Sequence, residues 1–154
     1  MMPKRKFLST EAQKKLQRFC VYQERCHQEV WAKLYSLGLS KSTSEAIVGY
    51  LIEKDFLNET RFAQSFARGK FKIKKWGKVK IHRELNKREI SEYNIKMGMK
   101  EISDSDYEET FNKLLDKKLS ELSHLSEREQ KRKIFNYLSY RGWEVEKIFE
   151  GLRK

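Results

Sequence analysis

The sequence predicts an all-α protein of elongated shape, on three observations. It contains only one proline and seven glycines in 154 residues, and the helix-favouring residues Lys, Glu, Leu and Arg are abundant. No window shows the sustained alternation of apolar and polar residues that is typical of a half-buried strand. Apolar residues make up 38% of the chain and charged residues 36%, so the core is expected to be thin and the exposed surface large.

Capping residues and glycines divide the chain into nine expected helices. Ser9 or Thr10 can cap the first helix, because a short hydroxyl side chain accepts a hydrogen bond from a free backbone N–H of the first turn. The second helix is expected over about residues 25–37. Ser42 and Glu45 have the spacing of a capping box and predict the start of the third helix.

The remaining helices begin at similar signals. Asn58 is expected to cap a fourth helix that runs to about Lys75, and a fifth spans residues 78–88. Ser91 caps the sixth. The last three are a seventh helix starting at Ser103 or Asp104, an eighth starting at the capping box of Ser126 and Glu129, and a ninth carrying Ile148 and Leu152.

Apolar residues recur at matching spacings in three parts of the chain, which indicates three repeated units. Five positions separated by 4, 5, 5 and 4 residues occur twice, 53 residues apart, and a third set matches with a longer turn. The sets are Ile81, Leu85, Ile90, Ile95 and Met99; Ile134, Leu138, Trp143, Ile148 and Leu152; and Val30, Leu34, Leu39, Ile47 and Leu51. Each unit is expected to close a small core with three helices. The expected units are residues 1–57, 58–102 and 103–154.

The tight turn inside each unit makes a specific demand on the backbone. Gly38 and Gly142 suit the left-handed conformation that commonly ends a helix. The equivalent residue of the middle unit is Glu89, for which that conformation costs about 1 kcal/mol or more. Either the middle unit turns differently, or the strain is tolerated.

The positive charge is concentrated in the middle of the chain. The net charge is +12, and from Arg68 to Arg88 ten of 21 residues are Lys or Arg, with Glu84 as the only acid. Such a surface attracts nucleic acid, acidic protein or anionic membrane. Apolar residues run through the charge, so the segment is expected to be structured, unlike a solvated tail. These anchors are Phe62, Phe66, Phe71, Val79, Ile81 and Leu85.

Several function classes lack their usual signature. No apolar run approaches the ~18 residues of a membrane span, and the first residues have no apolar stretch of a secretory signal. The spacing of Cys20, Cys26 and His27 does not match a zinc site, so we expect buried, reduced cysteines in a cytoplasmic protein, without a metal or other cofactor. Because neither a nucleophile motif nor a Walker-type loop is present, no catalytic residue is predicted.

Two segments of the basic region suggest a family. FLNETRFAQSF (residues 56–66) and WGKVKIHRELNKREI (residues 76–90) resemble the bacterial RecX regulators of the RecA recombinase. The Arg-Phe-Ala sequence of that family begins here at Arg61. Asp55 and Glu89 stand at two helix-terminating turns where the family usually has Gly.

The resemblance implies a cytoplasmic, non-enzymatic protein of three tandem three-helix repeats in an elongated, curved molecule. It implies that the protein lies along the groove of the RecA filament on DNA and inhibits strand exchange, ATP hydrolysis and co-protease activity in DNA repair and recombination. We expect a monomer that does not bind membranes. The alternative function is that of a stand-alone basic nucleic-acid-binding protein, in which residues 59–102 act like a helix-turn-helix.

The predicted binding residues are one tryptophan and the cations of the first two helices of the middle unit and of the segment between them. They are Arg61, Arg68, Lys70, Lys72, Lys74, Lys75, Trp76, Lys78, Lys80, Arg83, Lys87 and Arg88. Because these charges repel one another, an anionic partner is expected. DNA phosphates, contacted without strong sequence preference, and acidic residues of RecA both fit.

Two of the predicted binding residues have an alternative role. Arg61 lies in the first turn of its helix, where it either pairs with Glu59 or an acid of the first unit, or contacts the filament. Trp76 lies at a helix break and either packs between units or stacks on a base.

Overall fold

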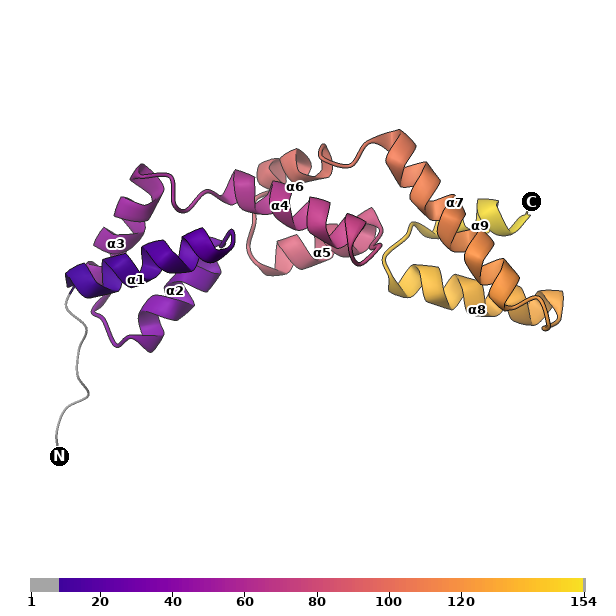
Figure 1. Ribbon diagram of the computed structural model, residues 1–154, viewed down its shortest axis with the longest axis horizontal. Coiled ribbons are helices and arrows are strands. Elements are labelled where there is room, and N and C mark those ends of the chain that lie inside the picture. Colours follow the sequence, from indigo (N-terminus) through magenta and orange to yellow (C-terminus); the bar gives the residue numbers. More distant parts are fainter. Residues whose placement is uncertain (1–8, 154) are drawn as a thin grey trace, which may run out of the picture.

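The structure is a computed structural model that describes residues 9–153, and this range contains nine α-helices and no β-strand (Figure 1). The helices are α1 (Ser9–Tyr22), α2 (His27–Ser36), α3 (Lys41–Glu53), α4 (Glu59–Lys72), α5 (Lys78–Lys87), α6 (Glu92–Met99), α7 (Asp104–Glu121), α8 (Glu127–Tyr140) and α9 (Val145–Arg153). The prediction of an all-α protein is confirmed.

The helices form three consecutive groups of three along an elongated, gently curved molecule (Figure 1). We refer to α1–α3, α4–α6 and α7–α9 as the first, second and third units. Neighbouring helices within each unit contact one another, and the contact between α4 and α6 is the most extensive. The first and third units lie at opposite ends, so the strongly basic second unit lies at the centre.

Side-chain caps begin several helices, and the predicted cap of α3 is wrong. The Asn58 side chain accepts from the backbone N–H of Arg61 at 3.0 Å, as predicted for the start of α4. For α3 the cap is Ser40, whose hydroxyl accepts from the N–H of Thr43 at 3.2 Å. Ser42 already lies in the first turn of that helix, so it cannot cap it.

Two helix boundaries differ from the prediction by two or three residues. α2 begins at His27 because the backbone of Cys26 is extended, with φ −96° and ψ 168°. α4 ends at Lys72, and the chain then turns through Lys75, which has a positive φ of 59°. Lys75 therefore lies in the turn between α4 and α5 and not on a helix.

The hydrophobic residues form two separate clusters. One belongs to the first unit, and the other runs without interruption through the second and third units and also includes Cys26. Twelve of the fifteen apolar residues that define the repeat are buried, whereas Leu39, Met99 and Leu152 are partly buried against these clusters. Val79 is 46% exposed, so its assignment as an apolar anchor is wrong.

The turn of the second unit has the same conformation as the turns of the other two. Glu89 has φ 60°, beside 71° for Gly38 and 87° for Gly142. The N–H of Glu89 donates to Asn86 O at 3.0 Å, and the N–H of Gly142 donates in the same way to Ser139 O at 3.0 Å. The left-handed strain at Glu89 is therefore tolerated, and the repeat keeps its geometry.

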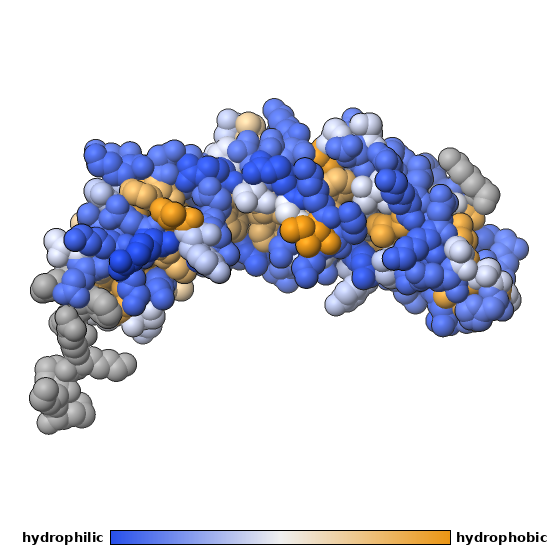
Figure 2. Space-filling model, in the orientation of Figure 1, coloured by the Kyte–Doolittle hydropathy of each residue, from blue (hydrophilic) through white to orange (hydrophobic). Residues whose placement is uncertain are grey.

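The surface is dominated by charged and polar residues. Figure 2 shows one face of the molecule, on which hydrophilic residues surround small, separate hydrophobic patches. This distribution fits a chain in which 36% of the residues are charged. In residues 9–153 no helix combines the length and the apolar character that crossing a bilayer requires.

Candidate functional site

The twelve predicted binding residues lie on α4, on α5 and in the turn between these helices. Half of them are exposed, namely Arg68, Lys72, Lys74, Lys75, Arg83 and Lys87. The other half are partly buried, namely Arg61, Lys70, Trp76, Lys78, Lys80 and Arg88. The side chains or backbone groups of the partly buried residues take part in contacts between units or between helices.

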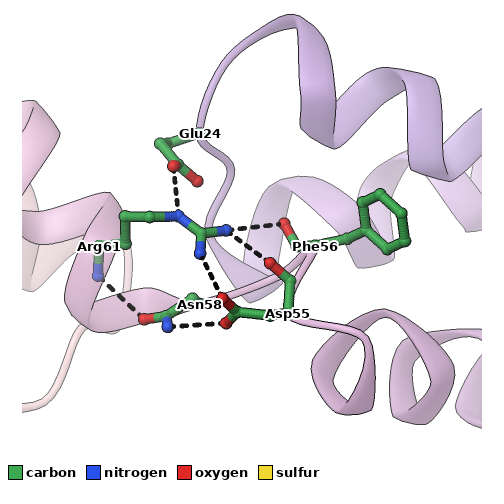
Figure 3. A network of polar contacts seen from close by, with 5 residues as sticks. All are labelled: Glu24, Asp55, Phe56, Asn58 and Arg61. Atoms are coloured by element: carbon green, nitrogen blue, oxygen red, sulfur yellow. Dashed lines mark hydrogen bonds and ion pairs between the residues drawn. The ribbon is translucent and has the colours of Figure 1, made fainter.

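Arg61 holds the first and second units together (Figure 3). Its Nε donates to Glu24 Oε2 of the first unit at 2.5 Å, and its Nη1 donates to Asp55 Oδ2 at 2.9 Å. Nearby, the N–H of His27 donates to Glu59 Oε2 at 3.0 Å. Of the two roles considered for Arg61, the structure shows the pairing with an acid of the first unit. We call this set of contacts the first interface.

The carboxylate of Asp55 makes two polar contacts at a turn where the resemblance led us to expect Gly. Its φ of 62° is left-handed, a conformation that Asp tolerates better than most residues. The amide of Asn58 donates to Asp55 Oδ1 at 3.0 Å, and Arg61 donates to the other oxygen. The bond from Asn58 and the charge of Arg61 lower the pKa of Asp55 below its ordinary value. The carboxylate is thus part of the first interface.

A second interface joins the second and third units through the backbone. The N–H of Gly77 donates to Arg141 O at 2.8 Å, and the N–H of Val79 donates to Gly142 O at 3.0 Å. The indole N–H of Trp143 donates to Lys75 O at 3.1 Å. A Cβ atom on Gly77 would lie 2.4 Å from Gly142 O, so only glycine permits this approach.

Tyr107 completes the second interface. Its hydroxyl accepts from the N–H of Lys78 at 2.9 Å and donates to Glu144, and its ring stacks on Trp143 with centroids 4.5 Å apart. Burial raises the pKa of Tyr107, and the hydrogen bond to Glu144 raises it further, so the hydroxyl stays protonated. The first turn of α5 is therefore anchored by the third unit.

Cations and aromatic rings alternate along the second unit and reach the third. The Arg88 guanidinium carbon lies 4.9 Å from the centroid of the Phe66 ring, and Lys70 Nζ lies 5.1 Å from the Trp76 ring. Lys80 Nζ lies between two rings, 4.6 Å from Trp76 and 4.7 Å from Tyr140. We call this set the cation–aromatic row, and its members are Arg88, Phe66, Lys70, Trp76, Lys80 and Tyr140. Trp76 both packs against Phe66 and presents its ring to two lysines.

Tyr140 was not predicted as a site residue. It is 74% exposed and comes from α8, 60 residues after Lys80. Its only sequence signal is an aromatic residue on the polar face of a helix, which is common on protein surfaces. The contact with Lys80 depends on how the second and third units meet, and this is not encoded in any local motif.

Some predicted cations are already paired with acids. Arg68 donates to Glu101 at 2.5 Å, and Glu84 pairs with Lys87 at 3.2 Å and with Arg88 at 3.4 Å. Among residues 9–153, six of the predicted cations have no carboxylate within 4 Å, namely Lys70, Lys72, Lys74, Lys75, Lys80 and Arg83. These six form the unneutralised part of the predicted basic surface.

Comparison with known proteins identifies the family. The model of the second three-helix domain of RecX matches residues 58–99, and the model of the third three-helix domain of RecX matches residues 105–152. Together the matches cover more than half of the chain. The chain belongs to the RecX family. The resemblance seen in the sequence is therefore confirmed, and the matched segments correspond to the second and third units.

Curated relatives extend the similarity beyond these two segments. The regulatory protein RecX of Pelodictyon phaeoclathratiforme is 31% identical over 125 residues, which cover 81% of this chain and 76% of the relative. That of Pseudomonas savastanoi pv. phaseolicola is 28% identical over 78% of this chain and 76% of the relative. The RecX protein of Lactobacillus gasseri is longer, and the chain spans only 46% of it, at 27% identity.

Solved RecX structures have the same fold. The crystal structure of RecX from Lactobacillus salivarius matches with a TM-score of 0.81 at 24% identity, over 94% of this chain and 96% of that one. A second RecX crystal structure matches with the same TM-score at 19% identity, over 94% and 72% of the two chains. Because both likenesses extend over nearly the whole chain, all three units share the RecX arrangement.

The described part of this RecX chain offers no cluster of three or more His, Cys, Asp or Glu residues suited to a metal ion. Cys20 and Cys26 are buried free thiols in different hydrophobic clusters. Burial raises the pKa of Cys26 to about 11, so this thiol is protonated at neutral pH and a weak ligand or nucleophile. The curated relatives are named as regulatory proteins.

Proposed function

We propose that this RecX protein binds the RecA–DNA filament and inhibits the recombinase in strand exchange, ATP hydrolysis and co-protease activity, without catalysis of its own. The proposal rests first on membership of a family whose named members are regulatory proteins. It places the protein in DNA repair and recombination in the cytoplasm, acting as a monomer.

The observation that carries the binding mode is the group of six unneutralised cations at the centre of an elongated body. Lysines and arginines without carboxylate partners repel one another, and a polyanion relieves this repulsion. In our proposal the six cations face DNA phosphates or acidic residues of the filament, while the first and third units reach along it. We propose residues 1–57, 58–102 and 103–154 as the three repeats, with the most basic repeat at the centre.

Charge reversal of the exposed cations tests this proposal. The variant Lys72→Glu, Lys74→Glu, Lys75→Glu, Arg83→Glu changes residues that make no ion pair in the described structure. The wild type is expected to depress the DNA-dependent ATP hydrolysis of RecA at concentrations comparable with the filament. We expect the variant to lose this inhibition and to keep its thermal unfolding midpoint.

A matched control separates a local site from a general effect of charge. Lys14, Lys117, Arg128 and Lys133 are exposed and lie in the first and third units. Replacing these four with Glu makes the same change in net charge, and inhibition is expected to persist. If both variants lose inhibition equally, or if the first variant still inhibits, the basic surface is not the binding site.

The helix-turn-helix alternative has a different outcome. A stand-alone nucleic-acid-binding protein would bind duplex DNA tightly without affecting RecA, with an affinity that falls steeply with salt. Tight duplex binding together with unchanged ATP hydrolysis would favour this alternative and contradict the proposed inhibition.

A further inference from the structure

A basic pocket lies in the first unit, outside the segment of the predicted binding residues. Its volume is about 340 Å³, and it is lined by Lys15, Arg18, Phe19, Tyr22, Arg25 and Lys33. Four of these six residues are cations and the other two are aromatic, so no acid lines the pocket. A cluster of this composition favours an anionic ligand that also has a flat apolar surface.

Arg25 is held in a fixed position within this pocket. Its guanidinium carbon lies 3.7 Å above the centroid of the Phe19 ring, and its Nε donates to Phe19 O at 2.9 Å. Within residues 9–153, its two terminal nitrogens Nη1 and Nη2 have no hydrogen-bond or ion-pair partner. A guanidinium fixed by stacking, with its terminal N–H groups available, has the geometry for two parallel hydrogen bonds to a phosphate.

Tyr22 provides an exposed aromatic ring beside the guanidinium group of Arg25. It is 83% exposed, and its ring centroid lies 5.9 Å from the guanidinium carbon of Arg25. Lys33 Nζ lies 5.6 Å from the Phe19 ring and adds a positive charge from α2. An exposed aromatic ring next to a phosphate-binding cation is the usual arrangement for stacking one base of a single strand.

We propose that this pocket binds single-stranded nucleic acid, with a phosphate on the terminal nitrogens of Arg25 and the adjoining base stacked on Tyr22. Arg18 and Lys33 strengthen the positive field around the phosphate. An acidic protein segment would satisfy the charges but would leave the Tyr22 ring without a flat partner. The contact goes beyond the proposed function, because it lies in the first unit and requires no recombinase.

Fluorescence anisotropy with labelled oligo(dT) of about 12 nucleotides, in the range of common single-strand site sizes, tests the proposal without RecA. We expect Arg25→Gln to weaken binding about tenfold, as for loss of charge-assisted hydrogen bonds. Tyr22→Ala is expected to weaken binding about fivefold, at the lower end of base stacking. An abasic oligonucleotide of equal length should lose the Tyr22→Ala effect and keep the Arg25→Gln effect.

Two control variants match the charge and the ring. Lys14→Gln removes an exposed charge of α1 that does not line the pocket, and Tyr35→Ala removes a ring of α2 that is 87% exposed. Both are expected to change binding less than twofold, a weak and nonspecific effect. Equal losses for Arg25→Gln and Lys14→Gln would overturn the proposal, as would unchanged oligo(dT) binding by Tyr22→Ala.

A loss of binding in the two pocket variants must be distinguished from a loss of folding. Arg25→Gln removes packing on Phe19, so its thermal unfolding is measured as well, whereas Tyr22 is so exposed that its removal leaves the core intact. Poly-glutamate serves as the acidic-protein probe. If Arg25→Gln abolishes poly-glutamate binding and leaves oligo(dT) binding unchanged, the pocket is a site for acidic protein and the proposal is wrong.

Discussion

The two interfaces that join the three units differ in their chemistry. At the first interface the side chains of Arg61 and Glu24 are 35% and 25% exposed, and that of Asp55 is 69% exposed. At the second interface Trp143 is only 1% exposed, and the backbones are joined directly by hydrogen bonds. The ion pairs of the first interface are therefore partly exposed to water, whereas the second interface combines backbone hydrogen bonds with the buried rings of Trp143 and Tyr107.

This difference indicates which part of the molecule can move. Ion pairs that remain near water are screened by salt and typically contribute about 1 kcal/mol or less. The second interface lies within one continuous hydrophobic cluster, which is closely packed and resists deformation. We therefore expect the second and third units to behave as one rigid body, to which the first unit is attached by a softer connection.

The largest loss of stability is expected when a single methyl group is added at the second interface. In Gly77→Ala the new Cβ would lie 2.4 Å from Gly142 O and 2.6 Å from Trp143 Cα. Because both neighbours are backbone atoms, the two turns must separate and strain or break their hydrogen bonds. We expect the free energy of unfolding to fall by about 2–4 kcal/mol, as for other overpacked sites, measured by urea denaturation.

Gly69→Ala is the matched control in the same unit. Gly69 lies within α4, and a Cβ there would meet nothing within 4 Å. This substitution is expected to stabilise the protein by about 0.5–1 kcal/mol, through the higher helix propensity of Ala. If Gly77→Ala also stabilises the protein, the close backbone approach at the second interface is not what joins the second and third units.

The three units were predictable from the sequence because the signals that define them are local. The Asn58 cap acts within one turn of its helix, and the apolar repeat identified twelve buried residues. The positive φ at Glu89 could not be decided, because the repeat required a left-handed residue and the residue type opposed it. Only the packed turn shows that the requirement of the repeat prevails over the strain.

The interfaces could not be predicted, because their partners are far apart in the sequence. Trp143 was correctly expected in the core, but its indole N–H bonds to Lys75, 68 residues earlier. Tyr107 contacts the N–H of Lys78 across 29 residues. No spacing rule connects such positions, so the contribution of the third unit to the basic surface appears only in the structure.

A moderate effect is expected at the first interface. Arg61→Gln removes the ion pairs to Glu24 and Asp55, and Glu24 Oε1 is already a buried atom without a hydrogen-bond partner in the described structure. We expect a loss of about 1 kcal/mol in unfolding free energy at low salt and a smaller loss at high salt. Small-angle X-ray scattering should show a larger radius of gyration, because the first unit is less restrained.

Arg68→Gln is the control for this loosening. It removes another ion pair, to Glu101 at 2.5 Å, but both partners of that pair belong to the second unit or directly follow it. The radius of gyration is expected to stay at the wild-type value. An unchanged radius in Arg61→Gln, or equal increases in both variants, would contradict a soft connection at the first interface.

The smallest change in unfolding free energy is expected when the carboxylate of Asp55 is removed, and this change should depend on pH. The folded pKa of Asp55 is lowered by Asn58 and Arg61, so its contribution to stability is present above the unfolded pKa of about 3.9 and is lost as the pH falls through the folded value. Asp55→Gly relieves the left-handed strain but lacks this contribution. The stability of Asp55→Gly relative to the wild type should therefore increase as the pH falls from 5 to 3, measured by urea denaturation.

Glu89→Gly is the control for this pH dependence. It relieves the same kind of strain at φ 60° without removing an interface contact, and its gain of about 1 kcal/mol in unfolding free energy should be the same at pH 5 and pH 3. An equal pH dependence for the two variants would mean that Asp55 serves only the turn and not the first interface.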